Sequence, residues 1–453
     1  WLKLRIIRAM PLAVPRDMSW QGPDGKRRSC HHGWVMLAAV SLITAASASG
    51  HSFSLAPFID GWLEELRISR PTFSAFWTAA MLITSATAPA IGSLIDRLGT
   101  RRVLFACVPL SVGCILWLGA LSTPAELAVA VTVNRVVNAD TLPLLGVTAL
   151  NSWFVRRRGR ASVVLGLMQA WLLEFPGLEL RLRLRLGSRL TYFAIAAYAG
   201  ALSLLAGAMW RDTPERVGLL PDLGREKPYG SRGTTPTGAE ASPLQLKAEG
   251  PPAEAPAAAA MADEAPAEVA FTRGQAARTL IFWATVLSQF SGNTLWQGCH
   301  LHLLDILAIR GLEAGSAGGF YDGVASARML VSLLLGCLVI DRLGRRSYLV
   351  LVFGTLPQLA VSLLLLGAIG PAAWRSWTAS LLGVVYGVWG GFNTAAGNVV
   401  FAQLFGRRHL GAVAGLAAGC VRLSGTLGPL LFGVVRDATG SYAFAIKAFT
   451  LAS

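Results

Sequence analysis

Long apolar runs separated by short polar connections dominate the chain from residue 34 onward. Each run has about 20 residues, the length at which an α-helix crosses the hydrocarbon core of a bilayer. The pattern therefore predicts eleven membrane-spanning helices and the truncated start of a twelfth. Their expected bounds are 34–58, 73–95, 103–122, 126–152, 161–177, 191–210, 280–304, 317–340, 348–370, 376–401, 411–435 and from 442 onward.

Residues 211–277 interrupt this pattern, because they are rich in Pro, Ala and Glu and contain no long apolar run. Such a composition cannot bury a core, so we predict a disordered linker. The chain then divides into an N-terminal tail (1–33), a first transmembrane half (34–210), the linker (211–277) and a second transmembrane half (278–453). The stretch DRLG follows the second apolar run of each half, from Asp96 and from Asp341. Two halves that carry the same loop at the same place are typical of secondary transporters.

The stretch Leu178–Leu190 does not fit a membrane helix, because Leu and Arg alternate in it. A period of two suits a strand with one polar face. The fifth helix is therefore predicted to be irregular. We favour an error of reading frame or splicing as the cause, and a genuine amphipathic segment at the membrane surface is the alternative.

Composition supports a membrane protein, since 53% of the residues are hydrophobic and only 14% are charged. Soluble proteins carry about 25% charged residues. The net charge of +15 would also suit a nucleic-acid-binding protein, but the basic residues lie in short clusters on alternate connections between apolar runs. The positive-inside rule places these clusters, the N-terminus and the linker in the cytoplasm. We expect a multi-pass protein surrounded by lipid, in the plasma membrane rather than an organelle, with no nucleic-acid partner.

Several sequence stretches resemble one known family. GSLIDRLGTRR from Gly92 is similar to the loop 2–3 signature of the major facilitator superfamily, and DRLGRR from Asp341 is similar to its second-half echo. Further stretches resemble the monocarboxylate transporter and oxalate/formate antiporter branch: GWVMLAAVSL from Gly33, NSWFVRRRGRA from Asn151, RDTPERVGLLPD from Arg211, HLLDILAIRGL from His302 and FGRRHLGAVAG from Phe405. The resemblance implies two six-helix halves that move small organic anions, monocarboxylates, by alternating access.

The repeated loops supply candidate gating residues. An Asp at one helix end can meet the positive end of another helix, and arginines can pair with acids. The resemblance implies that Asp96 and Arg97 hold a cytoplasmic gate closed. The remaining candidates are the neighbouring Gly99 and Arg101 and the second-half counterparts Asp341, Arg342 and Gly344. The alternative is that these charges only fix the topology.

Two arginines are predicted near the middle of the membrane, where a charge costs at least about 2.5–3.5 kcal/mol. Arg328 lies 12 residues before Ile340, and Arg422 lies 11 residues after Gly411. These separations correspond to depths of about 18 Å and about 16 Å. A guanidinium can bind a carboxylate through two hydrogen bonds, and Arg328 resembles the family's substrate-binding arginine of helix 8. Both residues are candidate substrate ligands, with a structural ion pair as the alternative.

Two further candidates are Arg135 and His302. Arg135 lies in NRVVNADTLP, where it either contributes to transport or pairs locally with Asp140. His302 matches the family's helix 7 histidine, and the alternative is an interfacial side chain. The family's proton-coupling Asp corresponds to Val324 here, and its helix 1 lysine has no clear counterpart. A proton and a counter-anion are therefore both open as coupling partners, as is facilitated diffusion.

No enzyme is expected, because HExxH, GxSxG and GxxxxGK[ST] motifs are absent from the sequence. We assign no catalytic residue, no metal site and no cofactor. Two alternatives to an anion transporter are kept. One is a carrier of neutral or cationic small molecules, and the other is a membrane sensor that does not transport.

Overall fold

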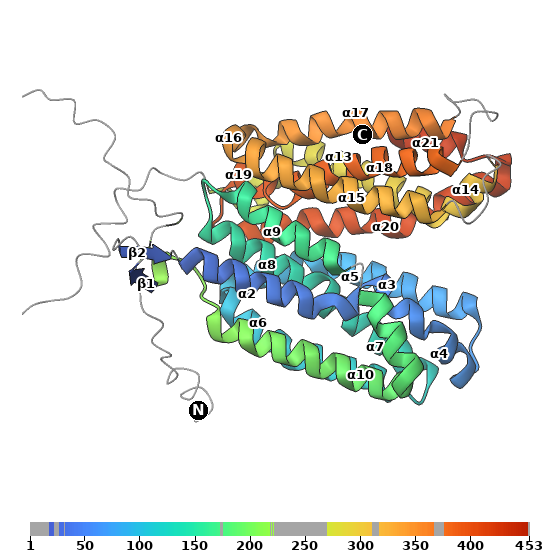
Figure 1. The fold of residues 1–453 in the computed structure, drawn as a ribbon, viewed down its shortest axis with the longest axis horizontal. Coiled ribbons are helices and arrows are strands. Elements are labelled where there is room, and N and C mark those ends of the chain that lie inside the picture. The colour runs from blue at the N-terminus through green and yellow to red at the C-terminus, as the bar shows by residue number, and fades with distance from the viewer. Residues whose placement is uncertain are drawn as a thin grey trace, which may run out of the picture.

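The computed structural model describes residues 18–21, 27–30, 32–172, 175–217, 219, 221, 270–309, 317–366 and 376–451. Two groups of helices, one from each half of the sequence, lie side by side with their long axes roughly parallel (Figure 1). Strands β1 (Met18–Gln21) and β2 (Arg27–Cys30) form a short antiparallel hairpin ahead of the first group. The helical membrane fold predicted from the apolar runs is confirmed.

The first group contains the six predicted spans of the first half. In chain order its elements are α2 (His32–Ala46), η1 (Ser47–Gly50), α3 (Ser52–Leu55), η2 (Ala56–Phe58), α4 (Ile59–Glu65), α5 (Arg70–Leu98), α6 (Thr100–Leu118), α7 (Pro124–Asn134), η3 (Arg135–Thr141), α8 (Leu142–Trp153), α9 (Arg158–Trp171), α10 (Phe175–Met209) and η5 (Glu215–Val217). The fourth span is thus α7, η3 and α8 in series. Its middle element η3 is a π-helix, a widened turn that is frequent at functional sites.

The second group repeats this organisation. Its elements are α12 (Arg273–Ala277), α13 (Leu280–Leu301), α14 (Leu303–Ile309), α15 (Ala317–Leu334), η7 (Leu335–Ile340), α16 (Asp341–Leu343), η8 (Gly344–Ser347), α17 (Tyr348–Leu366), α18 (Ser376–Gly397), α19 (Val400–Phe405), α20 (Leu410–Thr439) and α21 (Ala443–Leu451). Across the described residues of both groups, seven helical segments are long and apolar enough to cross a membrane. Breaks such as η3 divide other predicted spans into shorter helices.

The Leu/Arg stretch is helical, so the strand-like interpretation of its alternation was wrong. It lies in α10, which is broken at Gly187 by a non-helical backbone (φ 78°, ψ 167°). Leu and Arg are both strong helix formers, and alternate leucines also recur at the i, i+4 spacing of one helix face. The fifth span therefore consists of α9 and α10 up to Gly187, and the sixth is the rest of α10. This differs from the predicted ends at 177 and 191.

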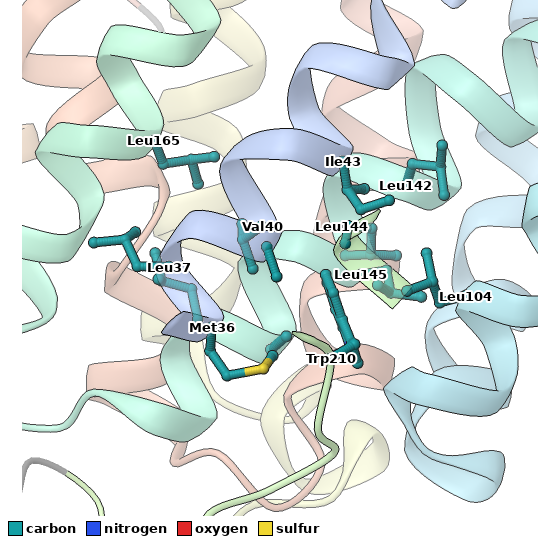
Figure 2. Close-up of a cluster of buried hydrophobic side chains, with 14 of the residues drawn as sticks. Met36, Leu37, Val40, Ile43, Leu104, Leu142, Leu144, Leu145, Leu165 and Trp210 are labelled. Carbon is teal, nitrogen blue, oxygen red and sulfur yellow. The ribbon is translucent and has the colours of Figure 1, made fainter. Parts of the chain in front are cut away.

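Buried apolar side chains fill the interior of each half. In the first half, Met36 and Val40 of α2 pack near Leu145 of α8 and against Trp210, which follows α10 (Figure 2). The indole Nε1 of Trp210 donates to Thr100 Oγ1 at 3.1 Å, so its polar group is satisfied. The second half has its own clusters around buried rings such as Trp389, Tyr386 and Phe432. Each half thus has an independent core.

Most of the predicted linker, residues 222–269, lies outside the described residues. Its two ends pack on the halves. Asp212 accepts the backbone N–H of Arg101 in the first turn of α6 at 2.7 Å. The backbone N–H of Phe271 donates to Phe405 O at 3.0 Å, shortly before α12. Because both ends contact the helix groups, the prediction of a disordered linker now applies only to the residues between them.

Candidate functional site

The carboxylate of Asp96 joins the first half to the second. It lies near the end of α5 and accepts the backbone N–H groups of Gly411 at 2.8 Å and Ala412 at 2.6 Å. These donors belong to the first turn of α20, where N–H groups have no partner within the helix. A carboxylate at such a helix terminus stabilises it by about 0.3–1 kcal/mol, and by up to about 2 kcal/mol when partly buried.

Asp341 makes the reciprocal contact. It follows η7 and accepts the backbone N–H of Gly159 at 2.6 Å, in the first turn of α9. Arg160 of the same turn adds an ion pair, with 3.5 Å between its Nε and Asp341 Oδ2. Each Asp of the repeated DRLG stretch therefore caps a helix of the opposite half. We call the end of the molecule that carries Asp96, Asp341 and these two helix starts the latch face.

Glycines let the halves approach closely beside these carboxylates. A Cβ added to Gly92 of α5 would lie 2.0 Å from the backbone oxygen of Gly411 in α20. A Cβ on Gly159 of α9 would lie 2.4 Å from the backbone oxygen of Gly336 in η7. Side chains are excluded at both crossings, since real Cβ contacts are never that short. The two crossings have equivalent places in the two repeats.

The other candidate gating residues take different positions. Arg97 and Arg342 are exposed on the latch face. Gly99 and Gly344 have positive φ values of 85° and 52° and terminate their helices. Arg101 is held through its backbone N–H by Asp212, and its guanidinium lies 5.7 Å from the ring centre of Phe105. The Asp residues of the two loops thus cap helices and the Gly residues end helices, whereas Arg97 and Arg342 have neither role.

The sequence analysis did not identify a second set of contacts at the latch face. Arg158 is buried, and its Nη1 donates to the backbone oxygen of Ala402 in the opposite half at 3.2 Å. Arg407 of the second half makes the converse contact with the first half. Its Nη1 lies 3.1 Å from the backbone oxygen of Ser152 and 2.5 Å from Glu215 Oε1. Both arginines had been counted as topology signals. Their places in the stretches that resemble the family were the available clue.

Arg422 of α20 forms an ion pair with Asp140 of η3. The exposed fraction of the side chain is 20% for Arg422 and 6% for Asp140, so water screens the pair weakly. The sequence predicts Arg422 near the middle of the membrane and leaves it open as a substrate ligand or as one member of an ion pair. The structure supports the alternative of an ion pair. This pair links the two halves.

Arg135 lies close to this pair. Its guanidinium lies 4.6 Å from the ring centre of Trp77, a cation–π arrangement. It also interacts electrostatically with both Asp140 and Arg422. The predicted local pairing of Arg135 with Asp140 is thus one part of a cluster in which the direct ion pair belongs to Arg422.

A cavity of about 230 Å³ lies in the second half. Its walls come mainly from α13 and α18, with one residue each from α15 and α20. The following polar and aromatic side chains are among its lining residues: Gln289, Asn293, Trp296, Arg328, Trp389 and Thr394. Arg328 is the charged side chain of this lining. Its Nε donates to Thr394 Oγ1 at 3.1 Å, and within the described residues no ion pair joins it to a carboxylate. The cavity therefore presents a positive charge that lacks a protein counter-ion in the described structure.

The shape of the cavity is fixed by packed rings. Trp296 lies 4.1 Å from Tyr386 and 5.5 Å from Trp389, measured between ring centres. The hydroxyl of Tyr386 donates to the backbone oxygen of Trp296 at 2.6 Å. A Cβ on Gly390 would lie 2.9 Å from the Trp296 ring and 3.5 Å from Arg328 Cδ. The absence of a side chain at Gly390 thus gives both residues their room.

His302 does not belong to this cavity lining. Its Nε2 lies 3.0 Å from the backbone oxygen of Pro429, and its ring packs 5.3 Å from Tyr442. Beside it, Asp305 accepts hydrogen bonds from the Tyr442 hydroxyl at 2.7 Å and from Arg436 Nε at 3.0 Å. These bonds, that of Tyr442 first, lower the pKa of Asp305. Both interpretations of His302, as a substrate ligand and as an interfacial side chain, therefore stay predictions.

Within the described ranges, no group of three or more His, Cys, Asp or Glu side chains is placed to hold a metal ion.

The comparisons with known proteins agree with this architecture. Among curated protein sequences, none matches the chain. The solved structure of the human organic anion transporter MFSD10 (TETRAN) is similar in fold, with a TM-score of 0.64 and 13% identity over 92% of this chain and 96% of that chain. Residues 37–429 match the Major Facilitator Superfamily, so this multi-pass membrane protein belongs to that superfamily of transporters.

Proposed function

We propose that this protein is a secondary active transporter of small organic anions, with monocarboxylates as the substrate class. The observation that carries the proposal is Arg328, a guanidinium in a cavity of about 230 Å³ with no carboxylate partner in the described structure. A half-buried charge with no opposite charge beside it is costly, and a substrate carboxylate would supply the missing negative charge. The resemblance of several sequence stretches to the monocarboxylate and oxalate/formate branch supports the same class.

The latch face supports a mechanism of alternating access. Asp96 and Asp341 each cap a helix of the other half, and such contacts would hold a gate at this face closed. The positive-inside rule predicts that this face is cytoplasmic. We propose that both caps break when the cavity opens to the cytoplasm, and that Gly99 and Gly344 keep the loops in shape. Residence in the plasma membrane remains a prediction from the sequence.

The Asp140–Arg422 pair suggests how substrate binding is linked to this movement. In the closed-latch arrangement the carboxylate of Asp140 occupies Arg422, so we assign first contact with the substrate to Arg328. Because the pair joins the two halves, it has to lengthen or break when they rock apart. Arg135 lies within electrostatic reach of both members and would stabilise Asp140 when Arg422 leaves. We propose that these three residues form the coupling element, with His302 outside it.

Uptake by reconstituted protein tests the proposal. Vesicles with wild type, Arg328→Lys or Arg328→Ala protein are supplied with labelled pyruvate, lactate, formate or oxalate, and with a neutral sugar as a contrast. Lysine keeps the charge but cannot bind a carboxylate through the paired hydrogen bonds of a guanidinium. The apparent affinity for a carboxylate therefore falls by about 1–3 kcal/mol, or about 5- to 150-fold. Alanine abolishes carboxylate uptake. The exposed Arg102→Ala variant is the control and leaves uptake near the wild-type level.

Normal carboxylate uptake by Arg328→Ala would overturn the proposed role of this residue. Uptake of the neutral sugar, together with no uptake of any carboxylate by the wild type, would favour the alternative carrier of neutral compounds. Absence of all transport across a broad panel of solutes would favour the membrane sensor. Coupling is read from the same vesicles by comparing uptake driven by an inward pH gradient with uptake driven by an internal carboxylate.

A further inference from the structure

The backbone break at Gly187 places the Leu/Arg stretch at a membrane surface. Met209, at the end of α10, lies near the latch face, where Trp210 contacts Thr100. The helical part of α10 from Ser188 to Met209 is about 32 Å long, close to the hydrocarbon thickness of about 30 Å. Gly187 therefore lies at the membrane surface opposite the latch face. Residues on both sides of it reach the level of the lipid headgroups.

One buried and one half-buried side chain fix how the preceding helical segment is rotated. The carboxylate of Glu179 is buried and accepts a hydrogen bond from Ser54. Arg183 donates to the backbone oxygen of Pro57, and its guanidinium lies 6.0 Å from the ring centre of Phe58. These contacts turn the side of α10 that carries Glu179 and Arg183 toward the first span. The other faces of this segment are left at the surface of the protein.

Three arginines on the two sides of Gly187 are exposed. Arg181 and Arg185 are exposed and lie four residues apart, on one side of the helix. Arg189, beyond the turn, is also exposed, and its guanidinium lies 5.8 Å from the ring centre of Phe193. The neighbouring α4 carries acidic residues, but no ion pair to these three arginines occurs among the described residues. Their charges are thus available to a partner.

Exposed leucines surround these arginines. Leu184 is 78% exposed, and the other members of the group are Leu178, Leu180, Leu186 and Leu190. Apolar side chains of this size avoid water, whereas arginines suit the phosphate level of a bilayer, where a guanidinium binds phosphate through two hydrogen bonds. Leucine and arginine side by side match the boundary between acyl chains and headgroups. The alternation that looked anomalous for a helix is suited to this location.

We propose that Arg181, Arg185 and Arg189 bind the phosphate of an anionic phospholipid in the leaflet opposite the latch face. The leucines of the same stretch contact the acyl chains of that lipid. A surface arginine favours an anionic lipid by about fivefold (about 1 kcal/mol). A local enrichment of at least this size is expected beside α10, and it does not depend on which solute the protein carries.

Site-directed photo-cross-linking tests this proposal. Benzoylphenylalanine replaces Leu184 in the full-length protein, which is reconstituted in vesicles of equal parts phosphatidylglycerol and phosphatidylcholine. Mass spectrometry then gives the ratio of the two lipids cross-linked. We expect phosphatidylglycerol to exceed phosphatidylcholine by at least about fivefold. The combined Arg181→Gln, Arg185→Gln and Arg189→Gln variant is expected to restore a ratio near one.

The matched control places the same cross-linker at Ala197, an exposed position farther along α10, near the middle of the membrane. It should capture both lipids about equally in every variant, which also shows that the variants are inserted. Excess inorganic phosphate should leave the enrichment at Leu184 intact, since the site holds a lipid rather than a free ion. Equal capture at Leu184 in the wild type, or enrichment that persists in the glutamine variant, would overturn the proposal. So would equal enrichment at Ala197.

Discussion

Asp140 of η3 in the first half and Arg422 of α20 in the second half form an ion pair between the two helix groups. Its members belong to two bodies that must move relative to each other in a two-half transporter. The pair therefore stabilises one arrangement of the halves over others. Its energetic weight can be measured because each residue can be neutralised alone or together with its partner.

Neutralising one member of this pair should harm the protein more than neutralising both. Asp140→Asn or Arg422→Gln leaves a buried charge uncompensated, which typically costs about 3–5 kcal/mol. The double variant removes both charges and should recover at least about 1 kcal/mol of the summed loss. Thermal unfolding of the four purified proteins in detergent measures this coupling. Strictly additive losses would show that the two charges do not interact.

Loss of one latch carboxylate should open the gate more often. Asp96→Asn removes the charge that stabilises the start of α20, an effect of about 1 kcal/mol and therefore about fivefold in the ratio of closed to open states. Cys420 follows Gly419 at the α5–α20 crossing and provides a native reporter. Its maleimide labelling, resolved by peptide mass spectrometry, should accelerate by up to that factor.

Arg97→Gln is the matched control for this experiment, because Arg97 is exposed on the latch face. Its labelling rate should stay near that of the wild type. Asp341→Asn should act on the other crossing as Asp96→Asn does on the first, and the effects should add because the sites are separate. Equal labelling of Asp96→Asn and wild type would contradict the latch role.

A methyl group at the α5–α20 crossing should destabilise the protein. A Cβ on Gly415 would lie 2.7 Å from the backbone oxygen of Ala88, and backbone cannot move aside as a side chain can. Gly415→Ala should lower the free energy of unfolding by about 1–3 kcal/mol. Gly113→Ala in α6 meets no atom within 4 Å and should stabilise slightly, since alanine favours helix. Similar melting temperatures for both variants would contradict the close crossing.

The cluster around Asp305 should make stability depend on acid pH. Its lowered pKa means that the folded protein favours the ionised carboxylate more than the unfolded chain does. The contribution is therefore present above the unfolded pKa of about 3.9 and is lost as pH falls through the lower folded value. Asp305→Asn should melt slightly below wild type at neutral pH, and the difference should vanish in strong acid. A difference that grows with acidity would have the wrong sign.

Some of these features were predictable from local sequence. Asp96 and Asp341 could be identified because the same loop occurs twice, and the depth of Arg328 and Arg422 follows from counting helical residues. The partners could not be identified in this way. Asp96 caps α20 at Gly411, and Asp140 neutralises Arg422, because helices of opposite halves lie together. Such neighbours depend on tertiary packing, which a single sequence does not display.

Misinterpretations had equally specific causes. A basic residue near a helix end can either fix the membrane topology or bind the opposite half of the protein. Arg158 therefore resembles a topology signal in the sequence, although it is buried and donates to Ala402 O. The alternation of Leu and Arg around Leu184 has the period of a strand, but both residue types favour helices, and this preference decides the structure. The kink at Gly187 then shifted the boundary between the fifth and sixth spans. Glycine was visible in the sequence, but its positive φ was not.

The glycine crossing of α5 and α20 has a mechanical consequence. At Gly92 and Gly415 the contact is backbone against backbone, so no side chain at these two positions has to withdraw from the facing helix when the crossing opens. Separation then requires no rotamer change at these positions and meets little steric friction. The barrier to separation of these two helices should then come mainly from polar contacts across the crossing, namely the two hydrogen bonds of Asp96 and the bond from Ser85 Oγ to Gly419 O. Close packing of glycines can in this way let two helices separate without rearranging the side chains between them.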